Sequence, residues 1–194
     1  MGKEIEASFY NVNRDAIVRQ LNALGARPAG NYDLRRINFQ VATRGKAGEA
    51  DYYTCWARVR SDGGKTTLTV KEQNGNEITG REEYEIETGD FEMTVKILSR
   101  IMPSAKYDYF ENHREIYDLD ALRFFIDKFP DLPYLLEIEG NSKEAIDSVL
   151  EKMEIGGEPD VKKSVPTSEY YRMHGADYSK VQNGYIDTLA RLID

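Results

Sequence analysis

The chain begins with Met1-Gly2-Lys3-Glu4-Ile5-Glu6-Ala7-Ser8-Phe9-Tyr10, a stretch in which polar and apolar residues alternate. A period of two is typical of a β-strand, because successive side chains of a strand point to opposite faces of the sheet. One face then carries Glu4, Glu6 and Ser8. Two carboxylates about 7 Å apart on one strand face repel each other unless a cation lies between them. The opening strand therefore has either a solvated acidic face or part of a cation site.

The same acidic pattern returns near residue 135. Leu135-Leu136-Glu137-Ile138-Glu139 again places two glutamates on one strand face, with an isoleucine between them. The alternating segments between the two acidic strands carry charges of both signs, namely Arg58, Arg60, Lys71, Arg81, Glu83, Glu85, Glu87, Arg114 and Asp127. The recurrence favours a shared functional face over scattered surface charge.

Periodicity and capping residues predict an antiparallel α+β fold. Strands are expected over residues 1–10, 32–41, 56–60, 67–71, 81–87, 107–110, 112–119, 121–128 and 135–139, and helices over 13–24, 90–102 and 142–154, with a last amphipathic segment over 185–193. The helix caps are Asn13 or Asn11, then Asp90, then Ser142, and Asp62-Gly63-Gly64 predicts a hairpin turn. A sheet with a charged face and an apolar face covered by helices suits a closed barrel.

Bulk composition narrows the class of protein. The 194 residues suit a single domain, and the net charge of −8, from 26 Lys+Arg and 34 Asp+Glu, argues against general nucleic-acid binding. No apolar run is long enough to span a bilayer, and the N-terminus lacks the apolar core of a signal peptide. The single Cys55 fits a reducing cytoplasm, and His113 and His174 share no zinc-binding motif. Neither common nucleotide-binding loop is present. We expect a cytoplasmic protein without a membrane partner.

A barrel lumen lined by both signs of charge must hold water, ions or a polyanion, because buried charges are costly to leave dry. Carboxylates prefer hard cations such as Mg²⁺ or Mn²⁺. Arginine and lysine hold phosphate oxygens. The sequence therefore predicts a site for a metal–polyphosphate complex, which is what phosphoryl transfer requires.

The order and spacing of several motifs resemble the CYTH family, also called triphosphate tunnel metalloenzymes. The motifs are Glu4-Ile-Glu6-Ala-Ser8, Trp56-Ala-Arg58-Val-Arg60, Thr69-Val-Lys71, Arg81-Glu-Glu83-Tyr-Glu85, Arg114-Glu-Ile-Tyr117 and Asp127 followed by Glu137-Ile-Glu139. The resemblance implies a closed eight-stranded antiparallel β-barrel forming a tunnel, with helices packed outside. It implies one CYTH-like domain over residues 1–194, with 173–194 as a C-terminal extension.

The resemblance also implies roles for these residues. The implied ligands of Mg²⁺ or Mn²⁺ are Glu4, Glu6, Asp127, Glu137 and Glu139. The implied triphosphate-binding residues are Arg58, Arg60, Lys71 and Arg114. Catalysis is expected of Glu4, Glu6, Arg58 and Lys71. The Arg81, Glu83 and Glu85 strand either contacts substrate or forms a salt bridge in the tunnel.

Three positions depart from the family pattern. Ser8 stands where the family's Glu-x-Glu-x-Lys motif has lysine, and Asn112 replaces a residue that is often lysine. The C-terminal Ser-Tyr pair becomes Ser168-Glu-Tyr170-Tyr171. Each lost charge-assisted contact costs about 1.5–3 kcal/mol unless it is replaced. Arg36 and Lys128 are candidate replacements, and Ser8 could instead make room for a bulkier or differently charged substrate.

Three functions follow from the resemblance. The first is a divalent-metal-dependent phosphohydrolase acting on inorganic triphosphate, a nucleoside triphosphate or thiamine triphosphate. The second is a class IV adenylate cyclase that makes cyclic AMP and pyrophosphate from ATP. The third is a nucleotide- or polyphosphate-binding module without catalysis, which the loss of the lysine at Ser8 favours. The amphipathic C-terminal segment is compatible with either covering the barrel or forming a homodimer.

Overall fold

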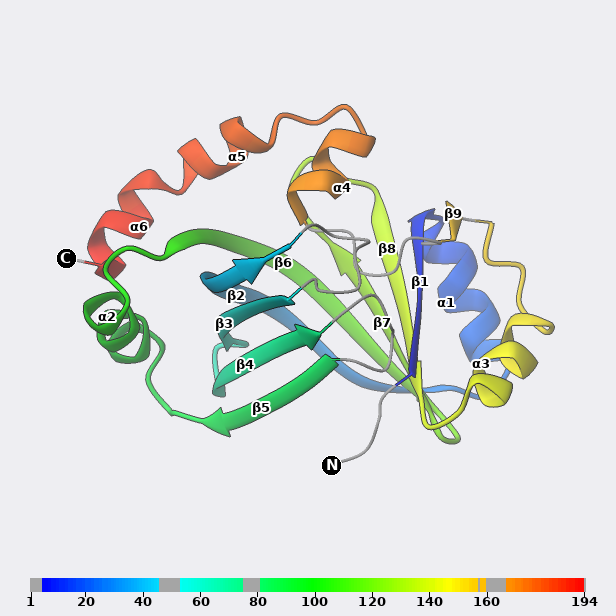
Figure 1. Cartoon of the computed structure of the whole chain (residues 1–194). Coiled ribbons are helices and arrows are strands. Elements are labelled where there is room, and N and C mark those ends of the chain that lie inside the picture. Colours follow the sequence, from blue (N-terminus) through cyan, green and yellow to red (C-terminus); the bar gives the residue numbers. More distant parts are fainter. Residues whose placement is uncertain (1–4, 46–52, 75–80, 157, 160–166, 194) are drawn as a thin grey trace. The chain divides into compact units, whose positions relative to one another are not determined.

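A computed structural model describes residues 5–45, 53–74, 81–156, 158–159 and 167–193 (Figure 1). The strands are β1 (Ile5–Val12), β2 (Arg27–Arg44), β3 (Tyr53–Ser61), β4 (Thr66–Asn74), β5 (Arg81–Glu87), β6 (Lys106–Leu119), β7 (Leu122–Lys128), β8 (Tyr134–Gly140) and β9 (Glu158–Pro159). The helices are α1 (Arg14–Ala23), α2 (Phe91–Ile101), α3 (Lys143–Leu150), α4 (Thr167–Met173), α5 (Tyr178–Gly184) and α6 (Ile186–Ile193). These elements confirm an α+β fold.

The strands form one sheet in the order β5-β4-β3-β2-β6-β7-β8-β1-β9. Strands β1 to β8 match the eight that the family resemblance implies, and β9 adds two residues beside Phe9 and Tyr10. The two segments expected at 107–110 and 112–119 are one continuous strand, β6. Hydrogen bonds among the described residues do not close the sheet, because β5 and β9 stand at the ends of this order.

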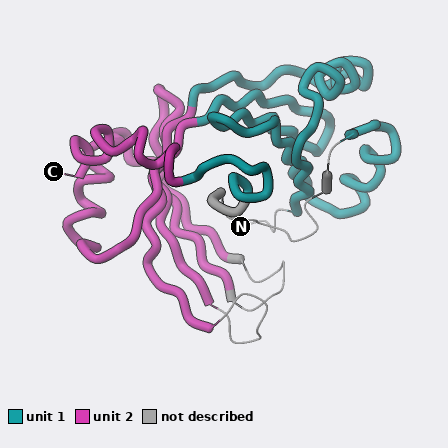
Figure 2. Tube along the Cα trace, turned by 90° about the horizontal axis from the view of Figure 1, so that it is seen from above, with its two compact units in different colours: residues 1–33, 112–178 teal, residues 34–111, 179–194 magenta. Residues whose placement is uncertain are grey.

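The chain divides into two compact units (Figure 2). Unit 1 comprises residues 1–33 and 112–178, and unit 2 comprises 34–111 and 179–194. The long strands β2 and β6 each run from one unit into the other, because the boundaries fall after Asp33 and before Asn112. Each unit has its own core.

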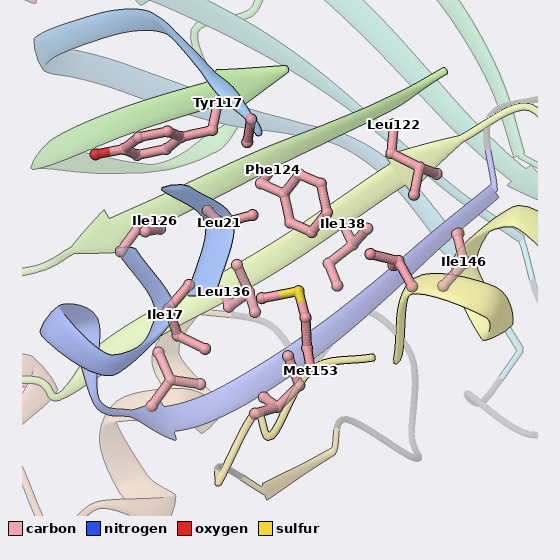
Figure 3. Packing of buried hydrophobic residues seen from close by; sticks show 14 residues of the cluster. Ile17, Leu21, Tyr117, Leu122, Phe124, Ile126, Leu136, Ile138, Ile146 and Met153 are labelled. Carbon is pink, nitrogen blue, oxygen red and sulfur yellow. The ribbon is translucent and has the colours of Figure 1, made fainter. Parts of the chain in front are cut away.

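In unit 1, helices α1 and α3 lie beside β1 and β8 (Figure 1). Ile17 and Leu21 of α1 pack with strand residues that include Phe124, Leu136 and Ile138 (Figure 3). These strand positions have the parity opposite to that of Asp127, Glu137 and Glu139. The helices therefore cover the apolar face of unit 1, and the charged residues point away from them.

In unit 2, α2 and α6 cover the apolar face. Phe91, Val95 and Leu98 of α2 and Leu192 of α6 pack with buried residues of β2 and β3. The strand residues are Ile37, Phe39, Ala57 and Val59, which alternate with the arginines of the same strands. Residues 185–193, expected to be amphipathic, thus supply part of this core.

Local signals set the helix starts as expected. The side chains of Asn13, Asp90 and Ser142 each accept a hydrogen bond from a backbone N–H three residues ahead, at 3.0, 2.8 and 3.2 Å. Gly25, with φ of +83°, follows the end of α1. The Asp62-Gly63-Gly64 turn joins β3 and β4, with Asp62 Oδ1 accepting from the backbone of Gly64 at 2.9 Å.

The described part of the chain includes no helix that is both long and apolar enough to cross a membrane. The connection expected at 43–50 and the turn expected at Asn74-Gly75-Asn76 lie largely outside the described residues.

Replacing Leu136 with alanine should lower the free energy of unfolding by about 2–5 kcal/mol, because a fully buried leucine leaves a cavity when truncated. Ile97→Ala is the control, since Ile97 is 54% exposed and its loss should cost about 0.5 kcal/mol or less. Urea denaturation followed by circular dichroism measures both. Equal effects would contradict the assignment of Leu136 to the core.

Candidate functional site

Each unit presents a polar sheet face opposite its helices. In unit 1, strands β6, β7, β8 and β1 bring polar side chains of one parity to this face, which we call the acidic face: Glu6, Ser8, Asn112, Arg114, Asp118, Arg123, Asp127, Glu137 and Glu139. Residues directly opposite each other in an antiparallel pair share a face, so the register fixes their neighbours. Glu6 lies opposite Glu139, and Ser8 lies opposite Glu137.

Arg114 is the centre of the acidic face. Its Nε donates to Asp127 Oδ1 at 2.7 Å, and its Nη2 donates both to Asp127 Oδ2 and, at 2.8 Å, to Glu137 Oε2. The guanidinium carbon lies 4.4 Å from the centroid of Phe125. Asn112 Nδ2 also donates to Asp127 Oδ1, at 2.9 Å. The structure thus joins Arg114, Asp127 and Glu137, which the sequence assigned separately to phosphate and metal.

Arg114 and Asp127 form the buried part of this cluster. The side chain of Asp127 is 1% exposed and that of Arg114 is 11% exposed. Burial alone would lower the pKa of Arg114, but the charges and hydrogen bonds of Asp127 and Glu137 raise it above its ordinary value. Arg114 is therefore a permanent cation that fixes Asp127 and one oxygen of Glu137.

A second row of charges crosses the acidic face four residues along β6 and β7 from the Arg114–Asp127 pair. Asp118, Arg123, Glu139 and Glu6 lie opposite one another in sequence across β6, β7, β8 and β1. Arg123 donates to Asp118 through Nε at 2.7 Å and through Nη2 at 3.1 Å. This hydrogen bonding lowers the pKa of Asp118, so Asp118 is anionic at neutral pH. The row contains three carboxylates and one guanidinium.

In unit 2, the polar face is rich in cations, and we call it the basic face. Arg36 lies opposite Arg60 across β2 and β3, and Asn38 lies opposite Arg58. Like charges directly opposite each other on a sheet are unfavourable, so this arrangement favours binding of an anion. The Arg36 guanidinium lies 5.6 Å from the centroid of Phe110. Arg36, Arg58 and Arg60, expected to bind phosphate, are therefore neighbours on one face.

On the basic face, β4 and β5 are linked by a salt bridge and a hydrogen bond between side chains. Lys71 Nζ lies 2.5 Å from Glu83 Oε1, and Thr69 Oγ1 donates to Glu85 Oε2 at 2.6 Å. A salt bridge was one of two expected roles for this strand, and Glu83 makes one. The side chain of Arg81 is outside the described part of the structure.

Lys128 lies on the other face of β7. It follows Asp127 by one residue, so strand alternation directs it away from the acidic face. Its Nζ donates to the Leu132 carbonyl and lies 5.4 Å from the centroid of Tyr134. The structure thus brings Arg36 to the polar faces as a candidate replacement for a lysine, but not Lys128.

The acidic side chains that the sequence assigns to a metal can be compared with the positions that the structure gives them. Among the described residues, no group of three or more His, Cys, Asp or Glu side chains has the arrangement of a metal site. Glu4 lies outside those residues. Both oxygens of Asp127 accept hydrogen bonds from Arg114. The directly opposed Glu6 and Glu139 are the donors that best fit a hard divalent cation, because an ion between them would offset their repulsion.

Comparisons with known proteins identify the family. The CYTH domain profile matches residues 53–167, more than half of the 194-residue chain, so the chain belongs to the CYTH domain family, the triphosphate tunnel proteins. No functionally curated protein matches the chain significantly.

Solved structures share the fold at low sequence identity. The PH1012 protein of Pyrococcus horikoshii is 20% identical, with 91% of this chain and 92% of that chain covered and a TM-score of 0.59. The PH1819 protein of the same organism is 14% identical, with 88% and 98% covered and a TM-score of 0.60. A Hippeastrum protein, described as an adenylyl cyclase with a dominant triphosphatase activity, is 17% identical, with 90% and 97% covered and a TM-score of 0.55.

Two residues in the second row of charges on the acidic face were not singled out from the sequence. Asp118 and Arg123 flank the β6–β7 hairpin, and each has the parity of the predicted site residues on its strand. Counting in twos from Arg114 to Asp118 and from Asp127 back to Arg123 would have found both.

Asp127→Asn should lower the free energy of unfolding by about 3 kcal/mol or more, because it removes the main partner of a buried guanidinium. Asp118→Asn is a matched control, since it breaks an exposed Arg–Asp pair on the same two strands and should cost about 1 kcal/mol or less. Urea denaturation gives both values. If the two variants were equally stable, the Arg114 cluster would contribute no more to stability than the exposed Arg123–Asp118 pair.

Proposed function

We propose that this protein is a divalent-metal-dependent phosphohydrolase acting on a triphosphate-containing substrate. The observation that carries the proposal is the cluster of Arg36, Arg58 and Arg60 on one face of unit 2, with Arg36 and Arg60 directly opposite each other in the strand register. A polyphosphate offers several anionic oxygens in a row, which suits several adjacent arginines better than a single carboxylate does. The activity described for the Hippeastrum protein supports the same class.

The basic face would bind and orient the triphosphate. Arg58 and Arg60 would each donate paired N–H groups to phosphate oxygens, and Arg36 would add charge lost at Ser8. Lys71 would add a further cation, and Glu83, at 2.5 Å, would fix the position of its ammonium group. In this proposal Arg81 and Glu85 support the β4–β5 edge of the site.

The acidic face would hold the metal. Glu6 and Glu139 would be the principal ligands, with Glu137 and the undescribed Glu4 beside them in the strand pattern. When bound, Mg²⁺ or Mn²⁺ would neutralise charge on phosphate oxygens and make water a better nucleophile. Asp127 would contribute by holding Arg114, and Arg114 would orient Glu137.

The family resemblance supplies the arrangement that this mechanism needs. We propose, on the family resemblance, that β1 to β8 form a closed eight-stranded tunnel. The substrate would then lie in a lumen with little bulk water, where charges interact more strongly than at an open surface.

Release of phosphate from inorganic triphosphate, ATP and thiamine triphosphate, each with Mg²⁺ or Mn²⁺, tests the proposal. We expect hydrolysis of at least one substrate, and its loss on chelation with EDTA. Arg58→Ala should lower kcat/KM by about 10- to 150-fold, which corresponds to the loss of one charge-assisted contact. Glu139→Gln should lower it similarly by weakening metal binding. Arg19→Ala and Glu144→Gln, at exposed positions on helices, are matched controls and should leave turnover unchanged.

Two outcomes would assign the protein a different function. Formation of cyclic AMP and pyrophosphate from ATP would identify an adenylate cyclase, the activity after which a similarly folded Vibrio parahaemolyticus protein is named. Tight binding of triphosphate without turnover would identify a binding module. Unchanged hydrolysis in Glu139→Gln would reject the metal assignment alone.

A further inference from the structure

Arg123 stands beside the two carboxylates that the proposed function assigns to the metal. The register of β7 and β8 places Arg123 directly opposite Glu139, and the register of β1 and β8 places Glu139 directly opposite Glu6. The three side chains therefore share the acidic face and succeed one another across three adjacent strands. A guanidinium at this point adjoins the proposed cation site.

Asp118 sets the position of Arg123. Two hydrogen bonds, of 2.7 and 3.1 Å, join the guanidinium to the two carboxylate oxygens of Asp118. A paired contact of this kind fixes the plane of the guanidinium as well as its distance. Because Asp118 lies on β6 and Glu139 on β8, Arg123 is held between two acidic strands.

Arg123 differs from Arg114 in exposure. The two form reciprocal Arg–Asp pairs on the same strands, with Arg114 on β6 and Arg123 on β7. The side chain of Arg114 is 11% exposed, whereas that of Arg123 is 53% exposed. Arg114 is thus suited to hold the site together, and Arg123 is accessible to an incoming ligand.

We propose that Arg123 is a specificity-determining residue that makes the acidic face prefer a metal–polyphosphate complex over the bare metal ion. The inference rests on the proposed function, because it requires the cation to bind at Glu6 and Glu139. A fixed positive charge beside these carboxylates repels a divalent cation that arrives alone. The same charge attracts an anionic phosphate chain, so the penalty is offset when metal and anion bind together.

The proposal predicts effects of opposite sign in one variant. Arg123→Gln should bind Mn²⁺ about 3- to 10-fold more tightly in the absence of any anion, because a neighbouring cation is removed. The same variant should bind inorganic triphosphate in EDTA about 3- to 10-fold more weakly, because an anion contact is lost. If Arg123 had only a structural role, the variant would bind both Mn²⁺ and triphosphate more weakly.

Free Mn²⁺ measured by electron paramagnetic resonance gives the first affinity, and titration calorimetry with inorganic triphosphate gives the second. Arg123→Lys keeps the charge, so its Mn²⁺ affinity should stay within about 2-fold of the original protein. Arg19→Gln removes an exposed arginine from α1, which packs on the apolar face, and should change neither affinity.

Unchanged affinities in Arg123→Gln, or two affinities that both fall, would overturn the role of Arg123. Failure of the unaltered protein to bind Mn²⁺ would overturn both this inference and the metal assignment. Normal Mn²⁺ and triphosphate binding without phosphate release would refute only the proposed hydrolysis, and the opposite shifts in Arg123→Gln would still decide the inference.

Discussion

The guanidinium of Arg114, placed between Asp127 and Glu137, is the interaction on which the acidic face depends. A buried charge is tolerated only where its partners replace the water that it has lost, and Asp127 does this with both carboxylate oxygens. The bond to Glu137 then extends the constraint to β8. Because β8 pairs with β1, the position of Ser8 beside Glu137 follows from the same register. A cluster that links three strands thus sets the geometry offered to a ligand.

Strand alternation separates this chemistry from the cores. In unit 1, Phe124 and Ile126 pack under α1 and α3, while Asp127 points to the other face. In unit 2, Ala57 and Val59 pack under α2, while Arg58 and Arg60 point to the other face. The alternation of side chains along each strand therefore produces both a hydrophobic core and a charged face in each unit. Burial of apolar side chains on the opposite face of the same strands offsets the repulsion between the like charges.

The sequence predicted what depends on local periodicity. The helix caps, the α+β class and the shared faces of Glu137 with Glu139 and of Arg58 with Arg60 follow from spacing alone. Pairings between strands depend on register, which is a long-range property that one strand does not encode. For this reason the contacts of Arg114 with Asp127 and Glu137, and the position of Arg123 opposite Glu139, were not predicted. Lys128 was proposed for its charge, although its parity opposes that of Asp127. Helices α4 and α5 were missed, because both are short and their sequences carry weak periodic signals.

Two neutral residues of the acidic face, Ser8 and Asn112, stand where the resemblance to the family leads us to expect lysine. Ser8 lies opposite Glu137 on β1 and brings no positive charge to that carboxylate, whereas Arg114 donates a hydrogen bond to it. With Asn112 in place of a second lysine, Asp127 receives a neutral hydrogen bond instead of a second positive charge. The formal charge of the cluster of Arg114, Asp127 and Glu137, counted from two carboxylates and one guanidinium, is −1. A more acidic face raises attraction for a cation and lowers it for a free polyanion. This balance gives Arg123 its importance, since it is the exposed cation of the row that contains Glu6 and Glu139.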